Sequence, residues 1–205
     1  MTRDDIVRTL IIKGSATPDA VASAVVSTPE HVGPILDRLV VDGLAEHVAN
    51  AFRLTRSGKA RAKQLLATDQ ARWGVSNAVA ALDAFLELDQ RTKEIVTAWQ
   101  VRDTRSGQVL NDHTDDRYDA RVLNQLAALH RDAKEWLSSI CSVLARFNTY
   151  RARLDRAVKS ASDGDGRFVA SPQVDSYHSV WFELHEELIL LAGRNRADET
   201  KAGRA

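Results

Sequence analysis

The stretch VASAVVSTPEHVGPILDRLVVDGLAEH (residues 21–47), continued by FRLTRSGKARA (residues 52–62), decides the fold of the first third of the chain. Thr28 followed by Pro29 is typical of a helix start, because threonine caps the N-terminus and proline fits the first helical position. Gly43 ends this helix where the backbone has to turn. The leucines within LDRLVVDGL (residues 36–44) predict that one face of the helix packs on a core.

The flanking segments predict more short elements. Upstream, Thr2 begins a helix that stops at Gly14, and Thr17 with Pro18 begins a second one. Downstream, LAEHVANAFRLT predicts two short strands around Ala49-Asn50-Ala51, and RSGKARAKQLL predicts a basic helix. The expected order is therefore three helices, a two-stranded wing and a further helix.

This order and the two quoted stretches resemble the winged helix-turn-helix of the MarR and PadR groups of bacterial transcription regulators. The resemblance covers residues 1–66 and implies a DNA-binding domain. It also implies a homodimer, since two copies are needed to read a two-fold DNA site.

Composition sets the wider limits. A chain of 205 residues with 44% hydrophobic content fits one or two domains with a sizeable core. Lys and Arg number 28 and so do Asp and Glu, so the net charge does not favour a nucleic-acid partner. The single cysteine, Cys141, excludes a disulfide framework within the chain and is interpreted as a small core residue. No apolar run reaches transmembrane length and MTRDDIV does not resemble a signal peptide, so we expect a cytoplasmic protein without membrane contact.

Residues 67–194 have the pattern of an all-helical bundle, which makes the expected fold class mostly α. Apolar residues recur at helical spacing over residues 69–101 and 122–147, and we expect these amphipathic stretches to form dimer seams. Residues 101–116 and 160–171 predict polar loops. Ser171 with Pro172 predicts the start of the last helix, and residues 195–205 predict a flexible tail.

The last helix contains HEELI (residues 185–189), which is similar to the H-E-x-x-H motif of zinc hydrolases. The second histidine of that motif is replaced by Ile189. His178 and His185 are two turns apart, about 10 Å along a helix, so they cannot bind one ion together. We therefore expect no metal site, and the histidines fit the edge of a core.

A ligand pocket is a second interpretation of the polar aromatic residues, which can gather between helices. Its predicted residues are Trp99, His113, Tyr177, His178, Trp181 and His185. The acids around His113, in NDHTDDRYD (residues 111–119), have a structural alternative, because carboxylates cap a helix and favour its positive end.

A second resemblance involves VTAWQVRD, NDHTDDRYDARVLNQLAALH and DSYHSVWFELHEELI. These motifs are similar to a helical region appended to bacterial proteins with a phosphoenolpyruvate-utilising, swivelling phosphohistidine domain. That domain and its histidine motif are not recognisable here, so no residue inherits its catalytic role.

Charge gives the argument for DNA. Residues 1–66 hold nine Lys and Arg against seven Asp and Glu, a net charge of +2, and residues 53–63 contain cations without an acid. The predicted DNA-binding residues are Thr28, His31, Arg38, Arg53, Arg56 and Lys59. Against DNA, the third helix also exposes Glu30 and Asp37. Pro34 would kink this helix, or the helix would start at Gly33.

The leading hypothesis is a dimeric DNA-binding transcription regulator whose helical region dimerises and senses a small-molecule effector. The alternative is a protein-interaction module that partners a phosphotransfer enzyme, with the winged helix as a docking domain. The sequence offers no nucleophile–base pair, no glycine-rich phosphate loop and no closed set of metal ligands, so we expect neither an enzyme nor a cofactor.

Overall fold

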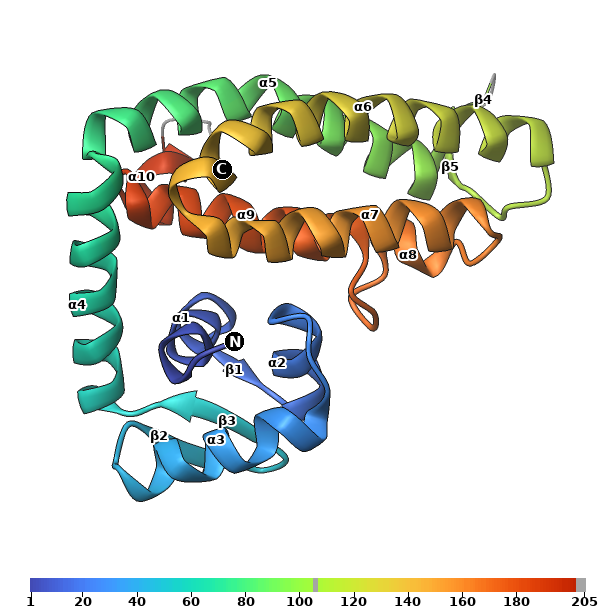
Figure 1. Cartoon of the computed structure of the whole chain (residues 1–205). Coiled ribbons are helices and arrows are strands. Elements are labelled where there is room, and N and C mark those ends of the chain that lie inside the picture. Colours follow the sequence, from blue (N-terminus) through green and yellow to red (C-terminus); the bar gives the residue numbers. More distant parts are fainter. Residues whose placement is uncertain (105–106, 202–205) are drawn as a thin grey trace.

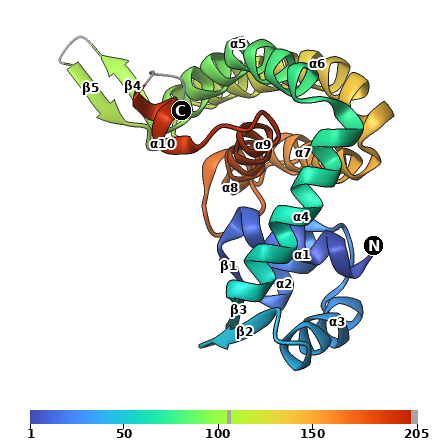
Figure 2. The same cartoon turned by 90° about the vertical axis from the view of Figure 1, so that its left-hand side faces the viewer.

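The computed structural model describes residues 1–104 and 107–201, which are mostly helical with two small antiparallel sheets (Figures 1 and 2). The first half of the chain contains α1 (Arg3–Lys13), β1 (Ser15–Ala16), α2 (Pro18–Ala24), α3 (Pro29–Val41), β2 (Ala45–Val48), β3 (Ala51–Leu54), α4 (Arg56–Trp73) and α5 (Val75–Gln100). The second half contains β4 (Val101–Thr104), β5 (Gly107–Leu110), α6 (Asp116–Val143), the 3-10 turn η1 (Ala145–Phe147), α7 (Asn148–Ser162), α8 (Arg167–Ala170), α9 (Tyr177–Leu191) and α10 (Arg196–Lys201). Within these residues, no helix is both long and apolar enough to span a membrane.

Threonine stands at the N-cap of α1, α2 and α3 as the sequence predicts, and its hydroxyl caps the first two of these helices. The Thr2 hydroxyl accepts from the backbone N–H of Asp5, whose carboxylate accepts from the Thr2 N–H, which completes a capping box. Thr17 caps α2 in the same way, through the N–H of Ala20. Helix α3 begins at Pro29 and continues through Pro34, so the alternative start at Gly33 is wrong.

The first sheet has the strand order β1-β3-β2. The two strands predicted around Ala49-Asn50-Ala51 are present as β2 and β3, although Ala51 belongs to β3 and not to the turn. Strand β1 adds a third strand through the pair Ala16↔Phe52. Helices α1, α2 and α3 bury their apolar residues with this sheet in one core, which includes Ile6, Leu10, Val32, Leu36, Leu39, Phe52 and Leu54.

Helix α4 joins this core to that of the helical region. Leu65 is buried in the first core and Trp73 in the second, so the predicted boundary after residue 66 lies inside a continuous helix. The helix ends at Gly74, which has a φ of +86° and separates α4 from α5. Figure 1 shows α4 as an upright helix that links the lower and upper parts of the molecule.

The apolar stripes of α5 and α6 are buried within the single chain, which corrects the prediction that these stretches form dimer seams. Phe85 and Leu82 on α5 and Leu129 and Leu137 on α6 are fully buried in the second core. These helices pack on each other and α9 packs on α5, so little apolar surface remains on them for a second copy.

The helical region is not all-helical, because the predicted polar loop after α5 contains the hairpin β4–β5. Val101 pairs with Leu110 and Arg102 with Val109, and these β-branched and long side chains suit a strand. Figure 2 shows the hairpin extending beyond the helices. Residues 105–106 of the predicted loop lie outside the described residues.

Three predictions for the C-terminal part are wrong. The last long helix begins at Tyr177 with Ser176 as its cap, because the Ser176 hydroxyl accepts from the N–H of Ser179 and is better placed than Ser171. The predicted loop over residues 160–171 contains the short helix α8. The predicted tail forms α10, where Glu199 is only 1% exposed, and residues 202–205 lie outside the described residues.

Candidate functional site

The outer end of the N-terminal region is the first candidate site. It consists of α3, the hairpin β2–β3 and the start of α4, which lie at the end of the molecule farthest from α5 and α6 (Figure 1). The exposed residues of α3 include Glu30, His31, Pro34, Asp37, Arg38 and Val41. Thr28 lies at the N-cap without capping the helix, and its hydrogen bond to Glu30 lowers the pKa of that carboxyl.

Two of the predicted DNA-binding cations are paired with acids. Arg53 lies 2.7 Å from Glu46 across the hairpin, and Arg38 lies 3.2 Å from Asp42 one turn later on the helix. All four side chains are at least partly exposed, so solvent and salt weaken these pairs. A phosphate can displace such a carboxylate, although doing so reduces the gain in affinity.

Three other cations are free. Arg56, Lys59 and Lys63 are exposed and form no ion pair or side-chain hydrogen bond within residues 1–104 and 107–201. Their spacing of three and four residues places them on one face of α4. We call this face the α4 cation strip. Lys63 was not among the predicted site residues, although its spacing from Lys59 already indicated it.

Three of the six predicted pocket residues, Tyr177, Trp181 and His185, are buried in the core of the helical region. Tyr177 stacks on Trp181 with ring centroids 5.8 Å apart, and Phe85 stacks on the other side at 4.7 Å. The indole N–H of Trp181 donates to Asp89 at 3.0 Å. His185 is 3% exposed and packs on Phe85, and burial lowers the pKa of its ring.

His178 is exposed and does not belong to this core. Together with Phe182 it lines a surface cleft that lies between the α8–α9 segment and the N-terminal region. The two histidines of the last long helix therefore have different environments. Among the described residues, no group of three or more His, Cys, Asp or Glu side chains could hold a metal ion.

The remaining predicted pocket residues, Trp99 and His113, form a separate cluster beside the hairpin β4–β5. Their ring centroids are 4.5 Å apart, and the Nδ1 atom of His113 lies 2.8 Å from Asp119. No ring contact or hydrogen bond within the described residues joins this cluster to Trp181. The residues of the predicted single pocket are thus divided among three places: the core, the cleft that His178 lines, and this cluster.

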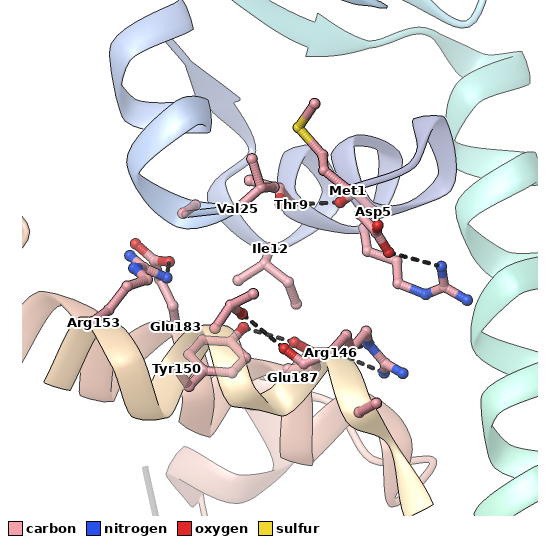
Figure 3. A pocket seen from close by; sticks show the side chains of 14 residues that line it. Met1, Asp5, Thr9, Ile12, Val25, Arg146, Tyr150, Arg153, Glu183 and Glu187 are labelled. Carbon is pink, nitrogen blue, oxygen red and sulfur yellow. Dashed lines mark hydrogen bonds and ion pairs between the residues drawn. The ribbon is translucent and has the colours of Figure 1, made fainter. Parts of the chain in front are cut away.

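A junction between the two regions is the feature that the sequence did not predict. A cavity of about 360 Å³ lies between α1 and the end of α2 on one side and η1, α7 and α9 on the other. Figure 3 shows the side chains that line it. Ile12 and Val25 supply its apolar wall. Tyr150, Arg153 and Glu187 belong to the opposite, charged wall.

Buried ion pairs cross this junction. The Arg153 side chain is 2% exposed and contacts Asp175 at 2.5 Å and Glu183 at 2.8 Å. Glu183 also accepts from Lys13 of α1 at 2.5 Å, and Asp175 accepts from Ser23 of α2 at 2.9 Å. A second set joins Arg8, Asp69, Arg146, Glu187 and Tyr150, with the Tyr150 hydroxyl donating to Glu187 at 2.6 Å.

The pKa shifts follow from this packing. Burial acts to raise the pKa of Asp175, but the hydrogen bonds and charge of Arg153 outweigh burial and lower it to about 2. Burial likewise opposes the charge of Arg153, yet its two carboxylate partners raise the pKa of the guanidinium. These charged groups form ion pairs and hydrogen bonds with one another. The junction therefore connects α1, α2, α7 and α9 structurally.

No family model, curated protein or solved structure matches this chain.

Proposed function

We propose that the protein is a DNA-binding transcription regulator in which residues 1–66 form a winged helix-turn-helix. The element order supports this proposal: α2 and α3 supply the helix pair, and β2–β3 supplies the wing. The pairing of β1 with β3 ties the base of that hairpin to the strand before α2.

The α4 cation strip is the observation that carries the proposal. Arg56, Lys59 and Lys63 have no internal partners and start directly after the hairpin, so they are available to phosphates. Arg53 adds a fourth cation once a phosphate replaces Glu46. Thr28, His31 and Arg38 are the residues on α3 proposed to contact bases or the sugar–phosphate backbone.

Dimerisation and effector binding complete the proposal. A two-fold DNA site needs two copies of α3. The junction cavity contacts α1 and α2, which pack on α3, so a small molecule bound there would alter how α3 is presented.

One observation favours the alternative of a docking module for a protein such as a phosphotransfer enzyme. The exposed face of α3 carries Glu30 and Asp37 against Arg38, a net charge of −1, and exposes 76% of Val41. An acidic face with an open valine suits a basic protein partner better than phosphates.

The test is selection of genomic DNA fragments by the purified full-length chain, followed by mobility shift of the best fragment. We expect a discrete retarded band that is lost when Arg56, Lys59 and Lys63 are all changed to Gln. The matched control changes three exposed cations elsewhere, Arg72, Arg117 and Arg131, to Gln and should leave the band unchanged. Equal loss in both variants, or no enriched fragment, would favour the docking module.

A further inference from the structure

A groove at the hairpin end of the helical region offers a second site, far from the proposed DNA surface. It has a volume of about 780 Å³ and lies between the end of α5, the start of α6 and the α7–α8 loop. Trp99, His113, Asp116, Leu123 and Arg167 are among the residues that line it. Its volume is in the range of sites for small molecules.

His113 is held by a network that leaves one ring nitrogen open. Its Nδ1 atom lies 2.8 Å from Asp119 and 3.2 Å from the Asn111 amide nitrogen. Since a carboxylate can only accept, we assign the Nδ1 proton to the bond with Asp119, which leaves Nε2 outside this network. The Asn111 amide donates to Asp119 at 2.9 Å and to the Trp99 carbonyl at 3.1 Å, and Asn111 itself is buried. His113 lines the groove with 43% of its side chain exposed, and Nε2 has no hydrogen-bond partner among the described residues. In the neutral ring this nitrogen accepts a hydrogen bond.

The backbone of His113 has a φ of +58°, in the left-handed region that costs free energy for residues other than glycine. This conformation places the imidazole against Trp99. Surrounding bonds maintain it, including the one from the His113 N–H to the Asn111 side chain at 3.3 Å.

Trp99 supplies the matching donor. The residue is 8% exposed and lines the groove, and its indole N–H has no hydrogen-bond partner in residues 1–104 and 107–201. Gly166 of the α7–α8 loop lies against the indole, where a Cβ atom would come within 2.8 Å of the ring. Two carboxylates also line the groove. Asp119 is held by Asn111 and His113, and Asp116 lies in the first turn of α6, where its charge favours the positive helix end.

The free groups select the class of ligand. Arg167 is the one cation among the described lining residues, and Asp165 holds it at 2.7 Å, which disfavours an anion. An amine would satisfy His113 and Asp116 but would leave the Trp99 N–H without an acceptor. A hydroxyl group both donates and accepts. We propose that this groove binds a neutral ligand with neighbouring hydroxyls, such as a monosaccharide or a cyclic polyol.

The experiment titrates the full-length ¹⁵N-labelled protein with D-glucose and with myo-inositol, using putrescine and inorganic phosphate as charged comparators. The Trp99→Phe variant identifies the indole resonance of Trp99. We expect a saturable shift of that resonance and of the His113 ring nitrogens with at least one polyol. No shift with either polyol, or a stronger response to putrescine or phosphate, would overturn the proposal.

Two variants separate binding from structure. His113→Asn retains a donor to Asp119 and tolerates a positive φ, so its melting temperature should stay near that of the wild type while polyol affinity falls about tenfold. Trp99→Phe keeps the aromatic packing and removes the N–H, and should also weaken binding. If His113→Asn does not fold, the polyol affinity of Trp99→Phe tests the proposal instead. Wild-type affinity in a folded variant contradicts the assigned contact.

Discussion

The junction and the outer end of the N-terminal region both present arginine and lysine, but they use them in opposite ways. At the junction, Arg153 is almost fully buried and has two carboxylate partners. On the α4 cation strip, Arg56, Lys59 and Lys63 are exposed and have none within the described residues. A chain with equal numbers of acids and cations thus pairs buried arginine and lysine with acids at an internal boundary, and leaves these three cations of an outer face unpaired within the described residues.

This difference separates structural charges from charges available for binding. A buried pair is costly to break because each charge has left water, whereas an exposed unpaired cation contributes little to folding. Changes at the junction should therefore affect stability, and changes on the strip should affect binding to an anionic partner.

Replacing Arg153 with Met should lower the free energy of unfolding by about 3 kcal/mol, because Glu183 and Asp175 lose their shared partner in a buried site. Urea denaturation measures the change. The control is Arg156→Met, since Arg156 contacts the same Asp175 but its side chain is 45% exposed. This control should cost less than about 1 kcal/mol. Equal costs in the two variants would show that burial does not distinguish these arginines.

Gly58 lies beside Lys59 of the α4 cation strip, and a substitution there tests whether the start of α4 is packed closely on the residues before the hairpin. A Cβ atom at this position would lie 1.9 Å from the carbonyl oxygen of Leu44, so Gly58→Ala should cost about 3 kcal/mol or prevent folding. Gly33→Ala is the matched control, because Gly33 is helical with nothing within 4 Å and alanine should add up to about 1 kcal/mol. Thermal melts compare the two, and a stable Gly58→Ala protein would refute the close contact.

The junction should also fail in acid. Since the pKa of Asp175 is about 2 in the folded protein and its ordinary value is 3.8, its contribution is complete above pH 3.8 and is lost as the pH falls towards 2. The loss amounts to roughly 2 kcal/mol. Burial lowers the pKa of His130 and His185, so a separate decline begins below pH 6.5.

Asp175→Asn isolates the carboxylate in this measurement. Between pH 4.5 and pH 2.5, the free energy of unfolding should fall less in the variant than in the wild type. The difference should equal the contribution of the Asp175 carboxylate. The same acid dependence in both proteins would mean that Asp175 is not the group that titrates.

The smallest effect concerns the paired cation of the hairpin. Glu46→Gln frees Arg53 without removing a positive charge, so DNA affinity should rise several-fold and its salt dependence should steepen by about one unit of slope. Fluorescence anisotropy with a labelled duplex measures both. Unchanged affinity would indicate that Arg53 does not approach the phosphates.

Local signals predicted the first part of the fold best. Thr2 and Thr17 cap helices, and strands flank Ala49 and Asn50, because these features depend on residues within a few positions of each other. The hairpin β4–β5 was missed because its strands are short, polar and mostly exposed, so no alternating apolar pattern marks them. Ser171 and Ser176 both resemble helix caps, and only tertiary packing selects Ser176.

The candidate sites were harder to predict for the same reason. Lys13 meets Glu183 across 170 positions of the sequence, and no local pattern links them. His113 and Trp181 were grouped as pocket residues because both are polar aromatic residues, whereas their positions depend on which helices pack together. The cations of residues 53–63 were visible in the sequence, but the pairing of Arg53 with Glu46 was not.

The most direct measurement for the central proposal is the salt dependence of duplex DNA binding by the full-length protein and by the variant with Gln at positions 56, 59 and 63. The account predicts that log affinity falls linearly with log salt for the wild type. For the variant, the slope should be shallower by about 0.9 for each lost phosphate contact, with an unchanged melting temperature. Identical slopes for the two folded proteins, or no salt-dependent binding by the wild type, would contradict the proposed DNA surface.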